Sequence, residues 1–516
     1  MFIDGWGMTV VGMGYASCVE GDTMEDEKKD STILGPAGLF KVAGERLKPW
    51  KTPNGDIFVD LWVDAVRHTV PVKSEAFTGL VYLLAQQAAP GKLPSAKAID
   101  EVRAYCVGMA LAGGRVMPAW VRVGGDSNRV IWYDLGGDSR EVVKWEGGVW
   151  GIYRQNPETP RFYRPNGMLE QVRPGEDGAR LVEVLGRHVR TRDDDIYLLA
   201  AWLVGAFKVG GPYPILIING EQGSSKSTTT RLLRKLVDPH ARDMREPPTN
   251  PRDLVAAVKN SYVLAVDNVS SIPGTLSDSL CRISTGTGAL GGRALYTDTD
   301  EAAFTACRPI VLNGIPAFAE REDLVSRSIN VELPSIPAAE RLDDDTFWER
   351  FDADMPELLA ALFQCVANAQ RGFAAVRLNE APRMANFARW AYAGLGQQDG
   401  DRFLSAYSRN KMEAAAHSIE HNEVAQALVA LMRDKEVWFG SWSRLLADLQ
   451  PLAVVSKFWP SNSLQLRNRV VRLSEDLRKC GLEWRNNGRE GGSGRSVIEV
   501  RRLKGYVDRH VLTSVT

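Results

Sequence analysis

The stretch Pro214–Leu233, PILIINGEQGSSKSTTTRLL, constrains the fold more than any other part of the chain. Its four consecutive apolar residues, Ile215 to Ile218, are typical of a strand buried on both faces of a parallel sheet. A glycine-bearing turn and a helix follow. The turn fits the P-loop spacing G-x-x-x-x-G-K-[ST] except at Ser225, which stands in place of the second glycine.

The turn and the first helical residues have the chemistry of a phosphate site. Backbone N–H groups from Gly223 to Ser227 would point inward at a helix start, where unpaired donors and the helix dipole favour an anion. Lys226 would reach the β- and γ-phosphates, and the Ser227 hydroxyl would coordinate Mg²⁺. Ser225 restricts the backbone, so we expect a reduced affinity. The alternative is a polar turn that binds no ligand. The residues expected to hold the nucleotide are Gly220, Gln222, Gly223, Ser224, Ser225, Lys226, Ser227 and Thr228.

Four more segments downstream have the composition of strands, and the intervals between them allow parallel crossovers. With the strand before the turn they predict an α/β domain with a five-stranded parallel sheet. The four segments are Ala241–Arg245, Tyr262–Val266, Pro309–Leu312 and Ile329–Leu333.

The second of these segments leads into Asp267, the position expected for an acid that holds Mg²⁺ and its water opposite Ser227. Asn268 follows, where many ATPases have a second carboxylate that polarises the attacking water. An amide orients water but is a poor base, so the sequence leaves the general base open. A strand-terminal aspartate is also a common turn or helix cap.

Two further polar residues stand at strand ends. Asn313 follows the next strand, where its amide can hold the lytic water and read the γ-phosphate; an ordinary Asn-Gly turn is the alternative. Arg327 stands between a short helix and the last strand, and from there it can act as an arginine finger on a neighbouring subunit's γ-phosphate. Arg321 competes for that role. Either arginine has a plainer alternative, a surface ion pair with Glu320, Glu322 or Asp323.

Glycines surround Arg293 and Tyr296 in the segment between the aspartate and asparagine strands. They indicate an exposed turn or hairpin that carries one cation and one aromatic ring. Such a tip can contact a phosphate and stack on a base.

In this order, the P-loop, the aspartate strand, a T-G-x-G-x-x-x-x-R-x-L-Y segment, the asparagine strand and Ser326-Arg327 resemble the superfamily 3 helicases. The resemblance is to the poxvirus-type primase-helicase branch of phages, plasmids and integrated elements, and it covers residues 181–334 well. It implies an AAA+-like ATPase core in a hexameric ring, with ATP between subunits and a hairpin that grips single-stranded DNA in the channel. By this resemblance Arg293 contacts DNA, Asn313 is the sensor and Arg327 is the finger.

Four other units are expected around the ATPase core at residues 211–335. Residues 1–153 read as an α+β domain of unknown role, in which Asp60 and Asp64 fit a solvated strand face. Residues 154–210 read as a connector and a helical pair, and residues 336–435 have the helical spacing of a bundle. Residues 436–516 outline a winged helix.

The winged-helix region is basic. Between Lys457 and Lys504 the chain has a net charge of +7, and a basic helix with a basic wing suits duplex DNA. A solvated face is the alternative, because acids are interspersed among the arginines. The expected DNA contacts here are Arg467, Arg469, Arg472, Arg489 and Arg495.

Composition adds limits. A chain of 516 residues is too long for one core, and its net charge of −1 hides the basic region. No stretch has the length and apolarity of a membrane span or a signal peptide, so we expect a cytoplasmic protein with no membrane partner. The six scattered cysteines fit reduced thiols.

Together these features predict an ATP-driven, ring-forming DNA helicase or translocase that replicates a mobile element. It would work as a homo-oligomer, with ATP and Mg²⁺ as cofactors and with room for a separate primase or initiator. Two alternatives stay open. Ser225 and Asn268 favour a nucleotide-gated DNA-binding switch with weak hydrolysis, in a defence or regulatory assembly. A small-molecule kinase shares the P-loop but leaves Asn313, Arg327 and the basic C-terminus unexplained.

Overall fold

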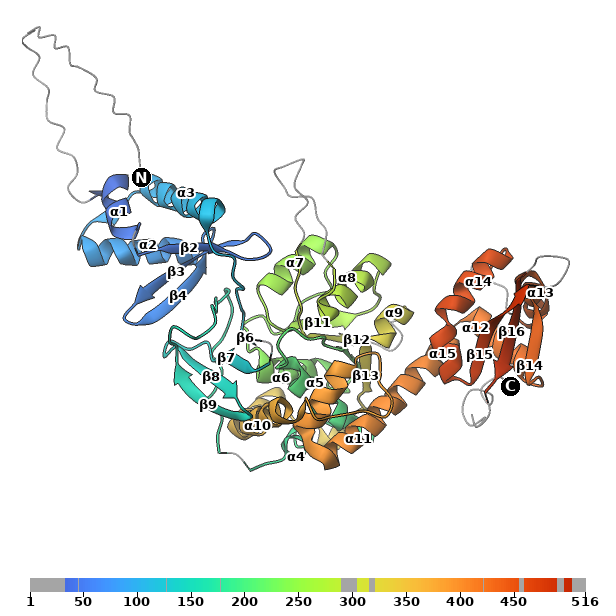
Figure 1. Ribbon diagram of the computed structural model, residues 1–516. Coiled ribbons are helices and arrows are strands. Elements are labelled where there is room, and N and C mark those ends of the chain that lie inside the picture. Colours follow the sequence, from blue (N-terminus) through green and yellow to red (C-terminus); the bar gives the residue numbers. More distant parts are fainter. Residues whose placement is uncertain are drawn as a thin grey trace, which may run out of the picture.

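The protein, seen in a computed structural model, has an N-terminal domain, a central part around a parallel sheet, and a C-terminal domain at the end of a long helix (Figure 1). Arg293, Tyr296 and Arg495 lie outside the described residues, and of Arg489 only the backbone is described. No helix among the described residues is long and apolar enough to cross a membrane. The described residues are 33–44, 46–126, 128–176, 178–288, 304–314, 321–420, 422–453, 459–489 and 496–503.

The N-terminal domain packs three helices against a small antiparallel sheet. Its elements are β1 (Ile33–Leu34), α1 (Pro36–Ala43), β2 (Lys48–Lys51), β3 (Ile57–Val63), β4 (Val66–Pro71), α2 (Glu75–Ala88), β5 (Leu93–Pro94) and α3 (Ala96–Gly113). The sheet has the order β2-β3-β4, and alternate residues of β3, Val59 and Leu61, point into the core against Phe77. Ser74 begins α2 because its hydroxyl accepts a hydrogen bond from the N–H of Phe77 at 3.3 Å.

Asp60 does not lie on a solvated strand face, so that prediction is wrong. The residue is 3% exposed, because β3 is the central strand of its sheet. Its carboxylate accepts hydrogen bonds from Trp50, Thr69 and Arg161 at 3.1, 2.8 and 2.7 Å, which compensate for the loss of water. Asp64 lies apart from it, in an exposed turn.

A second antiparallel sheet belongs to the core of the central part. Its strands, in spatial order, are β6 (Val123–Asp126), β7 (Val130–Asp134), β8 (Glu141–Glu146) and β9 (Val149–Arg154). From the sequence alone these four strands are expected to belong to the N-terminal unit at residues 1–153. In the structure Tyr133 and Trp145 share one hydrophobic core with Phe207 and Phe363. Trp145 also donates a hydrogen bond of 2.9 Å to the carbonyl oxygen of Phe363.

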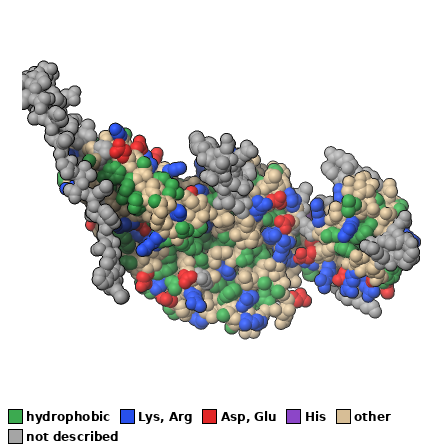
Figure 2. Space-filling view, turned by 45° about the horizontal axis from the view of Figure 1, so that its top comes forward, with side chains coloured by type: hydrophobic (Ala, Val, Ile, Leu, Met, Phe, Trp, Pro, Cys, Tyr) green, Lys and Arg blue, Asp and Glu red, His purple; other side chains and the backbone are tan. Residues whose placement is uncertain are grey.

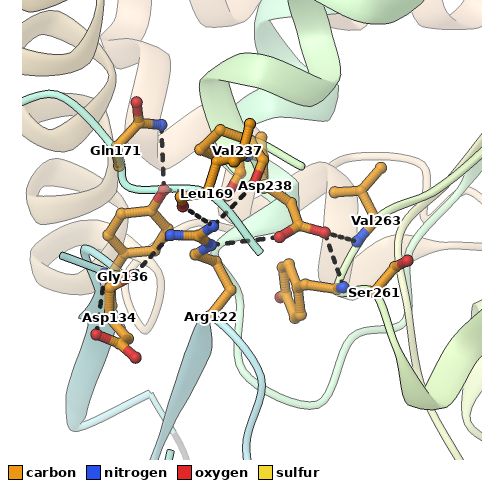
Figure 3. Close-up of polar contacts among 12 residues, drawn as sticks. Arg122, Asp134, Gly136, Leu169, Gln171, Val237, Asp238, Ser261 and Val263 are labelled. Carbon is orange, nitrogen blue, oxygen red and sulfur yellow. Dashed lines mark hydrogen bonds and ion pairs between the residues drawn. The ribbon is translucent and has the colours of Figure 1, made fainter. Parts of the chain in front are cut away.

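A buried ion pair joins this second sheet to the parallel sheet (Figure 3). Arg122 has no exposed surface, and its Nε lies 3.3 Å from Oδ1 of Asp238. The other oxygen of Asp238 accepts hydrogen bonds from the N–H groups of Tyr262 and Val263 at 2.8 and 3.0 Å. The remaining guanidinium donors bond to the carbonyl oxygens of Asp134, Leu135, Leu169 and Pro239.

The parallel sheet has four strands in the order β11-β12-β10-β13. Their bounds are β10 (Ile215–Asn219), β11 (Leu264–Val269), β12 (Ile310–Gly314) and β13 (Ser328–Glu332). The expected fifth strand, Ala241–Arg245, is not formed. Only Arg245 pairs with β11, through one parallel bridge to Val266. Pro247 and Pro248 come just after Glu246, and prolines lack the N–H groups that would extend the pairing beyond Arg245.

Helices cover the parallel sheet. They are α4 (Leu181–Gly186), α5 (Asp195–Ala206), α6 (Lys226–Val237), α7 (Pro251–Lys259), α8 (Gly274–Thr285) and α9 (Glu322–Ser326). The helix α5 is buried along almost its whole length, which explains why its residues are apolar on every side. It packs against α6 and β13.

Long helices follow the sheet, as the helical spacing predicted. After the short 3-10 helix η1 (Ala338–Glu340), they are α10 (Asp344–Gly372), α11 (Ala385–Glu420) and α12 (Glu423–Met432). Gly396, with a φ of 77°, interrupts α11. The first part of α11 packs on α5 and α10, and α11 also contacts the C-terminal domain (Figure 1).

The C-terminal domain combines short helices with an antiparallel sheet of order β14-β16-β15. Its elements are β14 (Val437–Ser441), α13 (Trp442–Leu449), η2 (Gln450–Leu452), α14 (Ser463–Arg472), α15 (Ser474–Lys479), β15 (Leu482–Arg489) and β16 (Ser496–Arg502). The helices α14 and α15 are separated at Leu473, whose ψ is 0°. Leu466 and Val470 of α14 are buried in the core of this domain.

Candidate functional site

The residues that follow β10 and β11 meet at one edge of the parallel sheet, because parallel strands end on the same side. Ser227 donates a hydrogen bond of 2.9 Å from its hydroxyl to Oδ1 of Asp267. Lys226 donates from Nζ to the carbonyl oxygens of Gly220 and Glu221, both at 2.8 Å. Burial lowers the pKa of Lys226, against the opposing effect of Asp267. A hydroxyl, a carboxylate and an ammonium group thus share one small site.

The turn before α6 keeps a tight backbone in spite of its missing glycine. Gly220 has a φ of 154°, and a Cβ there would lie 2.7 Å from the carbonyl oxygen of Leu333. Ser225 adopts φ 59° and ψ 29°, the left-handed conformation that costs a residue with a side chain roughly 1–2 kcal/mol. Ser224 is buried and its hydroxyl donates to the carbonyl oxygen of Glu221 at 2.9 Å. Gln222 is exposed on the turn, and Thr228 is half-buried in the first turn of α6.

Asn313 links three elements of the site. Its Oδ1 accepts a hydrogen bond of 3.0 Å from the N–H of Asn268. Asn268 lies near the end of β11 and has a left-handed backbone conformation, with a φ of 54°. Its Nδ2 donates to the hydroxyl of Thr230, on α6, at 2.9 Å. Asn313 is 1% exposed, and its amide is engaged on both sides. The Asn268 side chain is exposed.

This geometry fits a magnesium-bound phosphate group. Mg²⁺ in such sites takes one or two protein oxygens together with waters and phosphate oxygens. Ser227 and Asp267 can supply protein oxygens from opposite sides of the same space. Within the described part of the chain, no three or more His, Cys, Asp or Glu side chains gather as a separate metal site.

Arg327 lies at the opposite edge of the sheet, and Arg321 lies beside the first turn of α8. Arg327 directly precedes β13, and its carbonyl oxygen accepts a hydrogen bond from the N–H of Ile215, the first residue of β10. Its guanidinium forms an ion pair with Asp323. Burial acts to raise the pKa of Asp323, but the contact with Arg327 outweighs burial and holds this pKa below its ordinary value. Arg321 pairs with Asp278 at 3.0 Å. Both arginines therefore have an acidic neighbour in their own chain.

Arg341 is a neighbour of the turn that the sequence did not reveal. It follows η1, and its Nη2 lies 3.0 Å from the place that a Cβ on Gly223 would take. Its Nε donates to the carbonyl oxygen of Ile336 at 3.0 Å. No motif marks Arg341, because its position depends on how the chain folds back after β13.

The C-terminal domain carries the other cations expected to contact DNA. Figure 2 shows Lys and Arg beside Asp and Glu on this domain, at the right of the view. Arg467 and Arg472 of α14 are exposed, and within the described residues neither forms an ion pair with a carboxylate. Arg469 is half-buried on the same helix. By contrast, Arg485 and Arg501 are paired with Glu483 and Glu499 at 2.7 Å.

Two family models match the chain in succession. The family of actinomycete integrative conjugative element replication proteins matches residues 185–414, and the C-terminal domain of the same RepA protein matches residues 424–509. The search of curated proteins gave no match.

Solved structures of the NrS-1 C-terminal region show a weak overall similarity. The A form apo structure of its residues 305–718 is 10% identical, with 90% of this chain and 99% of that chain covered and a TM-score of 0.38. Another apo structure of this region is 11% identical, with 92% and 99% covered and a TM-score of 0.35. Similarity at this level carries no conclusion about function.

The two family matches include every candidate site residue from Lys226 to Arg472. They follow each other along the chain and together span more than half of it. Over these two segments the chain is therefore similar to the replication proteins of actinomycete integrative conjugative elements.

Proposed function

We propose that this protein is an ATP-driven, ring-forming DNA helicase or translocase. The observation that carries the proposal is the hydrogen bond of 2.9 Å between Ser227 and Asp267, beside Lys226 at the carboxyl edge of a parallel sheet. This is the combination of groups that binds a nucleoside triphosphate with Mg²⁺. The superfamily 3 resemblance and the family's role in replication support the same reading.

Each residue would have a separate task at this site. Lys226 would leave the carbonyl oxygens of the turn for the β- and γ-phosphates. Ser227 and Asp267 would hold Mg²⁺, which neutralises charge on the phosphates when it is bound. Asn313 would transmit the state of the γ-phosphate, since its amide joins Asn268 to α6.

The position of Arg327 supports the proposal of a ring. It stands at the amino end of β13, whereas the turn follows the carboxyl end of the neighbouring strand β10. The five residues of β10 put about 13 Å of strand between the two edges. Arg327 cannot complete the site of its own subunit across that span, but it can complete a neighbour's as a trans-acting finger. We propose a hexamer on the superfamily 3 resemblance.

DNA would contact two regions. The segment with Arg293 and Tyr296 would grip a single strand in the channel. The exposed arginines of α14, in a winged-helix arrangement with β15 and β16, would contact a duplex.

The variant Lys226→Ala tests the nucleotide site. Without the ammonium group the phosphates lose their main cation, and we expect DNA-stimulated ATP hydrolysis to fall about 100-fold or more. The measurement is phosphate release with and without single-stranded DNA. Lys97→Ala, an exposed lysine of α3, is the matched control and should keep full activity. Hydrolysis that Lys226→Ala leaves unchanged would rule out the site.

A nucleotide-gated DNA-binding switch is the second candidate function. Ser225 and Asn268 favour it, because both depart from the residues of fast ATPases and both adopt left-handed backbone conformations. Strand separation of a forked duplex with ATP distinguishes the two functions. ATP-dependent DNA binding with no unwinding at any protein concentration would support the switch.

A further inference from the structure

A cleft of about 470 Å³ lies between the N-terminal domain and the parallel-sheet domain. The N-terminal domain contributes the β2–β3 turn, the end of β4 and the chain that follows α3. The other wall comes from the end of α7 and from the residues that lead into β12. In Figure 1 the β2–β3 turn reaches from the N-terminal domain toward α7.

Specific contacts hold the two walls together. Asn54, in the β2–β3 turn, donates from Nδ2 to the carbonyl oxygen of Thr305 at 2.9 Å. Its Oδ1 accepts from the N–H and the hydroxyl of Thr305 at 3.1 and 2.9 Å. Asp56 pairs with Lys259 at 2.7 Å, and the Tyr163 hydroxyl donates to the carbonyl oxygen of Lys259. The cleft is therefore a fixed feature of the domain junction.

Aromatic rings line this cleft. Trp120, Tyr163 and Phe304 are partly exposed in it, and Phe58 lies behind Tyr163 with ring centroids 5.1 Å apart. Lys259 lies 5.0 Å from the ring centre of Phe304, so a cation and a ring share one face. Aromatic faces of this kind stack on nucleobases.

The charge of the lining is positive. Its cations are Lys73, Lys259 and Arg308, and its one acid, Asp56, is already paired with Lys259. Lys73 is exposed at the cleft, and within the described ranges no carboxylate pairs with it. Arg308 has a buried Nε without a hydrogen-bond partner, although Nη1 bonds to the carbonyl oxygen of Cys307 at 3.2 Å.

We propose that this cleft binds a nucleotide unit of single-stranded DNA, as a third DNA-contacting region, at the junction between the N-terminal domain and the ATPase core. Its volume is in the range of small-ligand pockets and leaves room for a base with its phosphate. Trp120 or Phe304 would stack on the base, while Lys73 and Arg308 would contact the phosphate. We choose a nucleic acid strand as the occupant because the lining contains both aromatic rings and the cations Lys73 and Arg308, for which the described residues show no carboxylate partner.

The location connects this cleft to the candidate nucleotide site. Phe304, Thr305 and Arg308 lead directly into β12, and β12 ends with Asn313 and Gly314. One five-residue strand thus joins the DNA cleft to the residue that contacts Asn268 and Thr230. The DNA cleft itself does not depend on the ATP assignment.

The test measures the affinity of the full-length protein for a fluorescein-labelled oligothymidylate without nucleotide. Phe304→Ala should weaken binding at least fivefold, the loss expected for one stacked base. Lys73→Ala, a surface change that leaves the fold intact, should lower the slope of log K against log salt by about 0.7. Trp62→Ala and Lys97→Ala, at exposed sites outside the cleft lining, are the matched controls.

Three results would overturn the proposal. Lys73→Ala and Phe304→Ala could both bind like their controls. A free mononucleotide could compete as well as the oligonucleotide, which would assign the cleft to a free nucleotide. A blunt duplex could compete equally, which would exclude single-strand recognition. Repeating the titration with Lys226→Ala separates the two sites, since a loss of cleft binding there would mean that the signal came from the ATPase core.

Discussion

Lys411, on α11, holds the backbone around Arg327. Its Nζ donates to the carbonyl oxygens of Ser326, at 3.1 Å, and of Ser328, on either side of that arginine. These bonds satisfy carbonyl groups at the end of α9, which a helix of five residues cannot pair internally. Lys411 is therefore a positioning residue for the finger proposed above.

Burial lowers the pKa of Lys411 to about 7, with Lys479 and Arg383 acting in the same direction and Glu475 and Asp476 against it. In the unfolded chain the lysine keeps its proton up to its ordinary pKa of 10.5. Between pH 7 and 10.5 the unfolded state therefore binds more protons than the folded state. The free energy of unfolding rises with pH over this range as a result. We expect wild type to gain up to about 1.4 kcal/mol per pH unit between pH 7 and 9 relative to Lys411→Met. Urea unfolding across that range measures it, with Lys97→Met as the exposed control. Parallel pH curves for wild type and Lys411→Met would refute the assignment.

At the scale of elements, the Arg122–Asp238 pair is a buried polar link between the β6–β9 sheet and the end of α6. Arg122→Met leaves the buried Asp238 charge without its cation, and we expect it to lower the free energy of unfolding by about 3–5 kcal/mol. The comparison is Arg173→Met, which removes an exposed pair with Glu141 and should change it by less than about 1 kcal/mol. Equal losses in urea unfolding would show that burial of the pair contributes nothing.

The exposed arginines of α14 lead to a prediction about the salt dependence of duplex DNA binding. Arg467→Ala and Arg472→Ala each remove an exposed cation, so each should lower the slope of log K against log salt for duplex DNA by about 0.9 if it contacts a phosphate. Arg478→Ala, whose cation lies 3.9 Å from Glu483, should change the slope less. Unchanged slopes for both α14 variants would place the duplex elsewhere.

The sequence predicted elements that depend on local patterns. The apolar run Ile215–Ile218 predicts a strand, which is observed as β10. Asp267 was placed opposite Ser227 because strand order and polarity bring their ends together, and the structure brings them within 2.9 Å. Residues fixed by distant contacts escaped prediction. Asp60 is buried by its neighbouring strands, the fifth strand stops at two prolines, and Arg341 reaches the turn through an irregular connection.

At the scale of the whole molecule, contacts at the domain junctions connect parts of the chain that are far apart in sequence. The ion pair of Arg122 fixes the second sheet to α6, and Asn54 fixes the N-terminal domain to Thr305, near the start of β12. On the other side, α11 runs from the core helix α5 to α15 of the C-terminal domain. A change at the proposed nucleotide site could therefore reach the two surfaces that we propose bind DNA on either side of it, the cleft and α14, through packed elements.

We also predict that each nucleotide site is completed by an arginine from a neighbouring subunit. Arg327 stands across the sheet from Lys226, so a single chain cannot offer both groups to one nucleotide. When Lys226→Ala and Arg327→Ala subunits are mixed, an interface forms in which the intact Lys226 of one meets the intact Arg327 of the other. We expect each variant alone to lose DNA-stimulated ATP hydrolysis, and mixtures to recover part of it, with a maximum near equal amounts. A mixture that hydrolyses no more than the average of its components would show that Arg327 does not act in trans. Arg321→Ala in place of Arg327→Ala repeats the test for the competing arginine, which is paired with Asp278 of α8.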